Sequence, residues 1–161
     1  MAQLSLHSPV GDLTVTEEDG RIISLDWGWV PAEWQQSTAL LERAAWQLNR
    51  YFDGEIGAFD LPLDPPGTAF QKKVWAEMLK IPAGETRSYG EIAKILGSAA
   101  QPVGTACGAN PIPILIPCHR IVAAGGRLGG YSGDGGLETK VALLRLEKAL
   151  PPKQQRFDIY R

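Results

Sequence analysis

The chain contains the run Asn110-Pro111-Ile112-Pro113-Ile114-Leu115-Ile116-Pro117-Cys118-His119-Arg120-Ile121. Its apolar residues 114–116 are β-branched-rich and lie between prolines, a pattern that predicts a short buried strand. Such a strand would place Cys118 at its end. The thiolate is the reactive form of a cysteine, and a neighbouring imidazole or guanidinium favours that form. Because His119 and Arg120 follow directly, the run predicts a nucleophilic cysteine.

The composition indicates a small globular protein. The 161 residues are 44% hydrophobic and 21% charged, which are ordinary globular values. No apolar run approaches membrane-spanning length and no signal-peptide pattern occurs at the N-terminus, so we expect a cytoplasmic protein without membrane contact. Cys107 and Cys118 are the two cysteines, and reduced thiols are expected in that compartment. Together with His7 and His119 they give no zinc-ligand spacing, so we predict no metal site.

Charge is distributed unevenly along the chain. Residues 1–70 carry 3 basic and 11 acidic side chains, a balance of −8, and residues 71–161 carry 13 basic and 7 acidic side chains, a balance of +6. A basic half is suited to the phosphates of nucleic acid. Two solvated faces of opposite sign would give the same asymmetry, so charge alone does not decide the partner.

Proline and glycine at residues 64–67 indicate a boundary between two domains, residues 1–64 and residues 65–161. The first domain holds no cluster of catalytic groups, and we interpret it as a scaffold. Its alternating patterns predict three strands, over residues 3–7, 12–16 and 21–27, and its helical pattern predicts one helix, over residues 37–52.

The second domain contains the pattern of a helix-turn-helix. Capping boxes at Thr68 and Ser88 begin helices that are predicted to run through Lys80 and Leu96. A connection over residues 98–101 then leads to a helix over 102–109, with Pro102 at its first position. Small residues dominate that helix, so another molecule can approach its backbone closely. A last helix is predicted over residues 137–150.

The run at residues 110–121 resembles the active-site signature of the O6-alkylguanine-DNA alkyltransferases, the methylated-DNA–protein cysteine methyltransferases. The resemblance covers roughly residues 55–150, and the N-terminal half more weakly. It implies an α/β fold, with an RNase H-like N-terminal subdomain and a helical DNA-binding subdomain that contains the helix-turn-helix. Further segments carry the same resemblance: residues 67–71, 74–75, 81–86, 88–90, 103–104 and 131–133.

The family's reaction moves an alkyl group from O6 of guanine in double-stranded DNA to the cysteine sulfur, after the base is flipped out of the duplex. The product is a thioether, which offers water no carbonyl to attack, so the cysteine is not regenerated. The resemblance therefore implies a DNA-repair protein that acts once, as a monomer, without metal or organic cofactor.

The resemblance also assigns site residues. The catalytic positions are Cys118 as nucleophile, His119 linked to it through a water, Glu147 orienting the histidine, Asn110 bracing the turn, and Tyr89 acting at the target phosphate and as proton donor to guanine. Tyr131 and Ser132 match the loop that lines the guanine pocket, and Pro113 and Ile121 are expected to wall the alkyl group. The expected DNA-binding positions are Gln101, Pro102, Val103, Gly104 and Ala106 on the second helix of the motif, together with Ser88 and Arg120.

One position departs from the family pattern. The family usually has an arginine that fills the space left by the flipped nucleotide, and this chain has Gln101 there, followed by Pro102. Glutamine can hydrogen-bond the orphaned cytosine but lacks the planar cation and much of the reach. Arg87 and Arg127 are alternative candidates for the wedge. Cys107, on the same helix, is either a small buried residue or a second thiol near DNA.

Three functions follow from these observations. The first is a self-inactivating repair alkyltransferase. The second is a noncatalytic alkyl-lesion sensor, against which Cys118 argues because such sensors lack the cysteine. The third is a Cys-His enzyme that has been repurposed to a substrate other than DNA. The first function predicts transfer of a methyl group from DNA to Cys118. The second predicts binding to DNA without transfer, and the third predicts no response to DNA.

Overall fold

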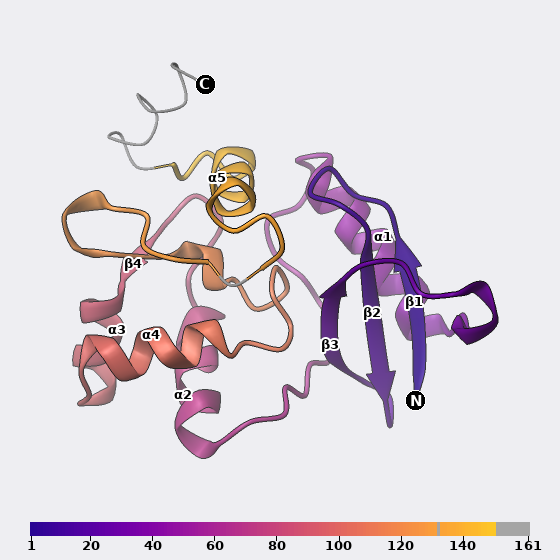
Figure 1. Cartoon of the computed structure of the whole chain (residues 1–161), viewed down its shortest axis with the longest axis horizontal. Helices are drawn as coiled ribbons and strands as arrows, with labels where there is room; N and C mark the ends of the chain where they lie inside the picture. The colour runs from indigo at the N-terminus through magenta and orange to yellow at the C-terminus, as the bar shows by residue number, and fades with distance from the viewer. Residues whose placement is uncertain (132, 151–161) are drawn as a thin grey trace. The chain divides into compact units, whose positions relative to one another are not determined.

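A computed structural model describes residues 1–131 and 133–150 of the chain (Figure 1). Its contacts divide the chain into two compact units. The first comprises Met1–Pro66 and Pro111–Leu115, and the second comprises Gly67–Asn110 and Ile116–Arg161. The family run at residues 110–121 therefore contributes to both units. The domain boundary at residue 64 stays a prediction.

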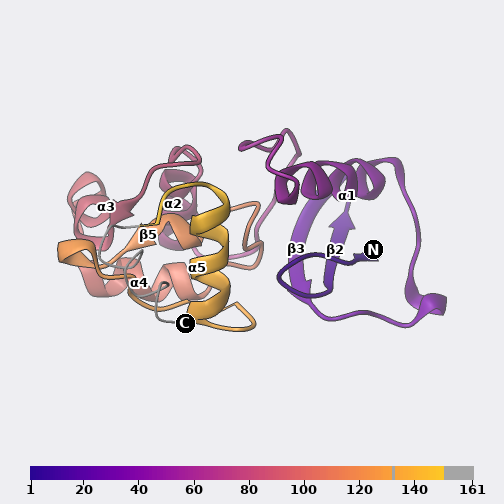
Figure 2. The same cartoon turned by 90° about the horizontal axis from the view of Figure 1, so that it is seen from above.

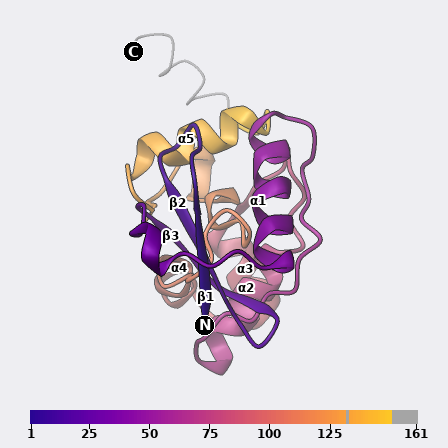
Figure 3. The ribbon, with the colours of Figure 1, turned by 90° about the vertical axis from the view of Figure 1, so that its right-hand side faces the viewer.

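The three strands predicted from alternation are present, and they form an antiparallel sheet in the order β1-β2-β3. The strands are β1 (Ala2–Leu6), β2 (Leu13–Glu18) and β3 (Arg21–Trp27), and a short helical turn, η1, covers Ala32–Trp34. Helix α1 (Ala39–Phe52) lies along the sheet and contacts β1 and β2 (Figures 2 and 3). Leu13, Val15 and Leu25 are buried, as are Leu41 and Leu48 of the helix, so this unit has its own apolar core.

The second unit is mainly helical (Figure 1). Both predicted capping boxes are present, at Thr68 and Ser88, where each hydroxyl accepts a hydrogen bond from the third backbone N–H of its helix. Its elements are α2 (Ala69–Met78), β4 (Arg87–Ser88), α3 (Tyr89–Leu96), α4 (Ala100–Gly108), η2 (Cys118–Arg120), β5 (Ile121–Val122), η3 (Ala124–Gly126) and α5 (Leu137–Leu146). Gly97 ends α3 in the left-handed conformation, and α3 and α4 pack together as the predicted helix-turn-helix.

The predicted strand over residues 114–116 is wrong. These residues are buried, as their apolar character requires, but residues 114–115 form a turn in which Ile114 has a φ of 73°, and Ile116 makes only a single β-bridge. Prolines at positions 111, 113 and 117 have no backbone N–H to donate to a strand ladder, which explains why burial here does not produce a strand. Cys118 consequently begins the short helix η2 rather than following a strand.

Several helix boundaries also differ from the predictions: α1 begins at Ala39 rather than at residue 37, and α2 ends at Met78 rather than at Lys80. Helix α4 begins at Ala100, so Gln101 lies in its first turn and Pro102 is its third residue. The first N–H groups of a helix have no intrahelical partner, so proline there removes no hydrogen bond. Helix α5 ends at Leu146 instead of continuing to residue 150, and Glu147 is its C-cap residue. Among the described residues no helix is long and apolar enough to cross a membrane.

Candidate active site

A two-residue parallel pairing positions the segment that carries Cys118. Arg87 pairs with Ile121 and Ser88 with Val122, so β4 and β5 lie side by side. Ser88 is also the N-cap of α3, and Cys118 lies three residues before Ile121. The pairing therefore holds the first residue of α3, Tyr89, close to the helical turn that begins at Cys118.

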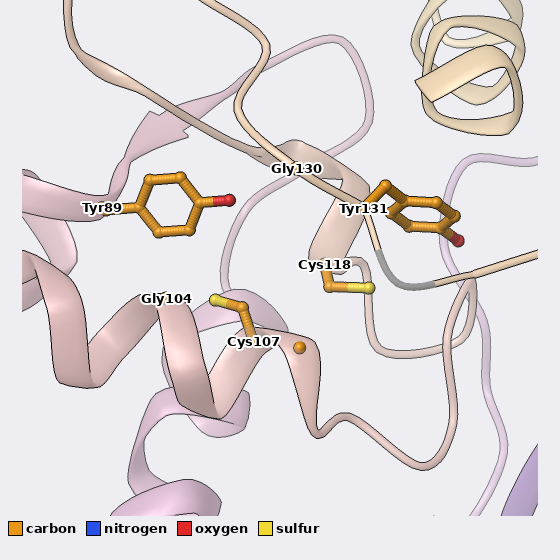
Figure 4. A pocket seen from close by; sticks show the side chains of 7 residues that line it. Tyr89, Gly104, Cys107, Cys118, Gly130 and Tyr131 are labelled. Carbon is orange, nitrogen blue, oxygen red and sulfur yellow. The ribbon is translucent and has the colours of Figure 1, made fainter. Parts of the chain in front are cut away.

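Cys118 lines a cavity of about 300 Å³ (Figure 4). Tyr89 and Cys107 lie on one side of the cysteine and Tyr131 on the other, and the hydroxyl of Tyr89 points toward Gly130. Cys118 is 6% exposed, so the sulfur is largely shielded from solvent. The lining residues are Tyr89, Gly104, Cys107, Gly108, Cys118, Gly130 and Tyr131.

The ring of Tyr89 lies between two glycines. A Cβ at Gly104 would lie 3.8 Å from the ring, whereas a Cβ at Gly129 would lie 3.0 Å from Cε2 and 3.1 Å from the hydroxyl oxygen. Gly129 also has a φ of 73°, which disfavours any side chain. Burial raises the pKa of Tyr89, and the two nearby cysteines raise it further. The hydroxyl therefore keeps its proton at neutral pH and is available as a hydrogen-bond donor.

The electrostatic surroundings of Cys118 favour a protonated resting thiol. Burial raises the pKa of the thiol, while a hydrogen bond with Asn110 and the charge of Lys140 lower it. Asn110 also donates from Nδ2 to the carbonyl of Ile116 at 2.8 Å, which fixes the amide beside the cysteine. The sequence suggested that the adjacent guanidinium activates the thiol. The structure corrects this expectation, because the guanidinium of Arg120 is bound to Glu147 and to the carbonyl of Ile81.

His119, Arg120 and Glu147 form a buried cluster. Nε2 of His119 lies 2.7 Å from Oε2 of Glu147, and these side chains are 0% and 2% exposed. Arg120 donates from Nε and Nη2 to the same carboxylate at 2.8 Å and 3.0 Å, and from Nη1 to the carbonyl of Ile81 at 2.6 Å. The carboxylate thus holds the imidazole and the guanidinium together.

The protonation state of His119 follows from this cluster. Burial lowers the pKa of His119, and the charges of Arg120 and Lys140 lower it further, against the opposing effect of Glu147. A neutral imidazole beside a carboxylate carries its proton on the nitrogen that faces the carboxylate. Nε2 therefore donates to Glu147, and Nδ1 is a proton acceptor. Nδ1 is buried and has no hydrogen-bond partner among the described residues.

Lys140 is a buried residue near Cys118 that sequence reasoning missed. Its side chain is fully buried, and Nζ donates to the carbonyls of Ile121 at 2.6 Å and Gly130 at 3.0 Å. Burial lowers the pKa of Lys140 to about 8. A lysine on a helix ordinarily faces solvent, but in the predicted helix Lys140 shares a face with Leu144, four residues on. This position on an apolar helix face is the sequence signal that could have identified Lys140 as a buried residue.

The remaining substrate-pocket predictions have different outcomes. Ile121 is buried and does not line the cavity, and it contributes its carbonyl to Lys140 instead. Tyr131 lines the cavity. Pro113 belongs to the first unit, and Ser132 lies outside the described residues. The roles of Pro113 and Ser132 stay predictions.

The predicted DNA-binding residues divide by exposure. Gln101 and Pro102 are exposed on the first turn of α4, and Gly104 and Ser88 are partly exposed. Val103, Ala106 and Arg120 are buried, at 0%, 2% and 5% exposure. That these three residues contact DNA stays a prediction; the guanidinium of Arg120 is bound to Glu147.

No group of three or more potential metal ligands occurs among the described histidine, cysteine, aspartate and glutamate side chains. Both cysteines are free thiols, and Sγ of Cys107 lies 3.9 Å from Sδ of Met78. Burial raises the pKa of Cys107 to about 12, so at neutral pH this second thiol stays protonated.

Comparison with known proteins identifies two matching family models. Residues 3–65 match the ribonuclease-like domain of 6-O-methylguanine DNA methyltransferase, and residues 69–149 match its DNA-binding domain. The two matches adjoin at the proline-rich segment that was predicted as a boundary.

Individual proteins are similar over most of the chain. A methylated-DNA–protein-cysteine methyltransferase of Mycobacterium tuberculosis is 44% identical over 155 residues, covering 92% of this chain and 93% of that protein. The protein of the same name from Methanosarcina acetivorans is 48% identical over 120 residues, covering 73% of this chain and 76% of that protein. The crystal structure of Mycobacterium tuberculosis OGT in complex with DNA superimposes with a TM-score of 0.83 at 43% identity, covering 98% of this chain and 100% of that chain.

Proposed function

Because this chain belongs to the methylated-DNA–protein-cysteine methyltransferase family, we propose that it repairs O6-alkylguanine in double-stranded DNA by transferring the alkyl group to Sγ of its own Cys118. One observation carries the proposal: Cys118 lines a cavity between Tyr89 and Tyr131, and the next residue, His119, is fixed by the buried carboxylate of Glu147. Nucleophile, base and orienting group are therefore all present at one site.

The first step is removal of the thiol proton. Burial raises the pKa of Cys118, so a thiol at rest needs a base, and neutral His119 offers Nδ1 as the acceptor. A water between the two groups would relay the proton. The imidazolium that forms is stabilised by the carboxylate of Glu147, and the thiolate by the charge of Lys140.

The second step is displacement at the alkyl carbon. A bond forms between Sγ and that carbon while the bond between the carbon and O6 breaks, and its electron pair passes to the guanine. The hydroxyl of Tyr89 donates a proton to the departing base, which leaves as neutral guanine. The imidazolium of His119 later returns a proton to the phenolate through solvent, so charge and protons balance. The thioether left on Cys118 does not hydrolyse, and the protein acts once.

The cavity also suits a flipped base. A base in a duplex is out of reach of a buried sulfur, so the target nucleotide must leave the stack. Tyr131 offers an aromatic face beside Cys118, and the glycines of α4 let a nucleotide approach the helix backbone. The monomeric state and the cytoplasmic location stay predictions.

The test uses the whole chain and a duplex that carries one O6-methylguanine. We expect a stoichiometric and permanent gain of one methyl group in the intact mass, located on the peptide that contains Cys118 and absent from the peptide that contains Cys107. Cys118→Ser should bind the duplex without gaining mass. Methylation of any other residue would overturn the assignment of the nucleophile, and binding without transfer by the wild type would favour the lesion sensor.

A further inference from the structure

The wall that α4 contributes to the cavity is made of small residues. Gly104, Cys107 and Gly108 line the cavity from this helix, together with Cys118 and two tyrosines. Sγ of Cys107 lies 3.9 Å from Sδ of the buried Met78, so this side chain is held against the core of the second unit. Gly108, the last residue of α4, borders the cavity with backbone alone.

The fold does not require a glycine at position 108. The φ of Gly108 lies outside the left-handed region, and a Cβ added there would meet nothing within 4 Å. In contrast, a Cβ at Gly104 would lie 3.8 Å from the ring of Tyr89, and a Cβ at Gly129 would lie 3.0 Å from that ring. Glycine is also a poorer helix former than alanine. What glycine supplies at position 108 is therefore empty space beside the cavity.

Hydrogen bonds hold the two backbones that border this space. Nε1 of Trp75 donates to the carbonyl of Ala106 at 2.9 Å, a buried contact that ties α4 to α2. On the other side of the cavity, Lys140 donates to the carbonyl of Gly130 at 3.0 Å and so holds the loop that passes there (Figure 4). Gly108 and Gly130 are both exposed, so the cavity opens to solvent at these two residues.

Displacement at a saturated carbon fixes the direction in which a bulky alkyl group extends. The attacking sulfur and the departing oxygen lie on opposite sides of the reacting carbon, so every other substituent of that carbon points sideways. The rings of Tyr89 and Tyr131 close two of the directions sideways from Cys118 (Figure 4). The space at Gly108 leaves a further direction open for a large substituent.

We propose that Gly108 is a specificity-determining residue, whose missing side chain lets the cavity accept O6 substituents larger than methyl, such as a benzyl group. This inference rests on the proposed function and deepens it to the class of alkyl group. Sγ of Cys118 bonds to the benzylic carbon while the bond from that carbon to O6 breaks. The electron pair of that bond passes to the guanine, which takes a proton from Tyr89. The benzyl ring lies in the space that a side chain at position 108 would occupy.

The experiment uses two duplexes of one sequence, which carry either O6-methylguanine or O6-benzylguanine. Single-turnover rates of transfer to Cys118 are measured by intact mass for the wild type, Gly108→Ala and Gly108→Leu, and each protein is described by the ratio of its benzyl rate to its methyl rate. Gly108→Leu should lower this ratio about tenfold or more, because a few carbons of excess bulk in an apolar pocket have effects of that size. Gly108→Ala should lower it less. An effect of either substitution on DNA binding or on folding acts on both duplexes alike and cancels in the ratio.

Ala109→Leu is the matched control. Ala109 is the exposed neighbour of Gly108 at the same end of α4, and its side chain does not line the cavity. Added bulk there should leave the ratio of the two rates unchanged. A fall as large as that of Gly108→Leu would overturn the inference, because bulk outside the cavity would then have the same effect as bulk inside it.

The other outcomes separate this inference from the proposed function. A wild type that accepts methyl but not benzyl would overturn the role of Gly108 and leave the repair function intact, as would a Gly108→Leu variant with the ratio of the wild type. A wild type that gains no methyl group from DNA would overturn the repair function itself. Alanine is a better helix former than glycine, so Gly108→Ala keeps the test decisive if leucine disturbs the fold.

Discussion

Nε2 of His119 lies 2.7 Å from Oε2 of Glu147, although the two residues are 28 positions apart in the chain. Both side chains are buried, and the carboxylate also accepts two hydrogen bonds from Arg120. The histidine can thus gain a proton next to a negative charge that Arg120 holds in place. In the reaction proposed above, Glu147 is therefore a positioning residue for the base.

Glu147→Gln should slow methyl transfer by at least about 100-fold, because an amide does not stabilise the imidazolium of His119. It should also lower the free energy of unfolding by about 3–5 kcal/mol, since the charge of Arg120 loses its buried partner. Rates are measured by intact mass under conditions where circular dichroism shows a folded protein. The control is Glu85→Gln, which removes an exposed ion pair with Arg87 and should cost less than about 1 kcal/mol. An unchanged rate in folded Glu147→Gln would exclude the positioning role.

The buried histidine should make stability depend on pH. The pKa of His119 is lowered in the folded protein, so the unfolded chain binds the proton more readily. The contribution of this group to the free energy of unfolding is fully present above pH 6.5. It is lost as the pH falls toward the pKa that His119 has in the folded protein, by at most about 1.4 kcal/mol per pH unit.

Proton NMR of the two imidazoles measures this directly. The resonance of His119 should titrate below pH 6.5, and His7→Asn, at the exposed histidine, identifies which resonance is which. Titration of His119 above pH 6.5 would contradict the neutral, buried base.

The parts of the site that could be predicted from the sequence are those that are contiguous in it. Cys118 and His119 are neighbours in a specific run, and the capping boxes at Thr68 and Ser88 are local patterns of side chain and backbone. Glu147 was reached only through the family resemblance, since a glutamate near a helix end is ordinarily exposed. The contacts that bury it come from Arg120 and His119, and no local pattern encodes them.

Two details of the site region depend on more than residue type. Burial of residues 114–116 was inferred correctly, but the turn there depends on neighbouring prolines and on packing within the first unit. The resemblance placed Arg120 among the DNA-binding residues, and in the structure its guanidinium binds Glu147 and the carbonyl of Ile81 inside the protein. For Arg120, tertiary partners decided a burial that residue type alone left open.

Lys140→Met should raise the pKa of Cys118 and slow methyl transfer about tenfold or more. The substitution keeps the apolar stem of the side chain but removes the charge that favours the thiolate and the donor to the carbonyls of Ile121 and Gly130. Alkylation of Cys118 by iodoacetamide, followed over pH by peptide mass spectrometry, measures the shift. Lys73→Met, at an exposed lysine of α2, is the control. If the pH profile of Cys118 matches the wild type while transfer slows, Lys140 acts only through the carbonyls.

Gly129→Ala should slow transfer about tenfold because the new Cβ would lie 3.0 Å from Cε2 and 3.1 Å from the hydroxyl of Tyr89. Gly126→Ala is a close control: Gly126 has a φ of 78°, near the 73° of Gly129, but nothing lies within 4 Å of its added Cβ. Both variants carry the cost of a side chain in the left-handed region, about 1–2 kcal/mol, so stability should fall alike. Transfer should slow only where the ring of Tyr89 is displaced. In a Tyr89→Phe background, where the hydroxyl donor is already gone, Gly129→Ala should slow transfer by a smaller factor than it does in the wild type.

The outcome that would contradict this prediction is equal slowing by Gly129→Ala and Gly126→Ala. It would mean that backbone strain in the loop, and not the position of Tyr89, limits the reaction.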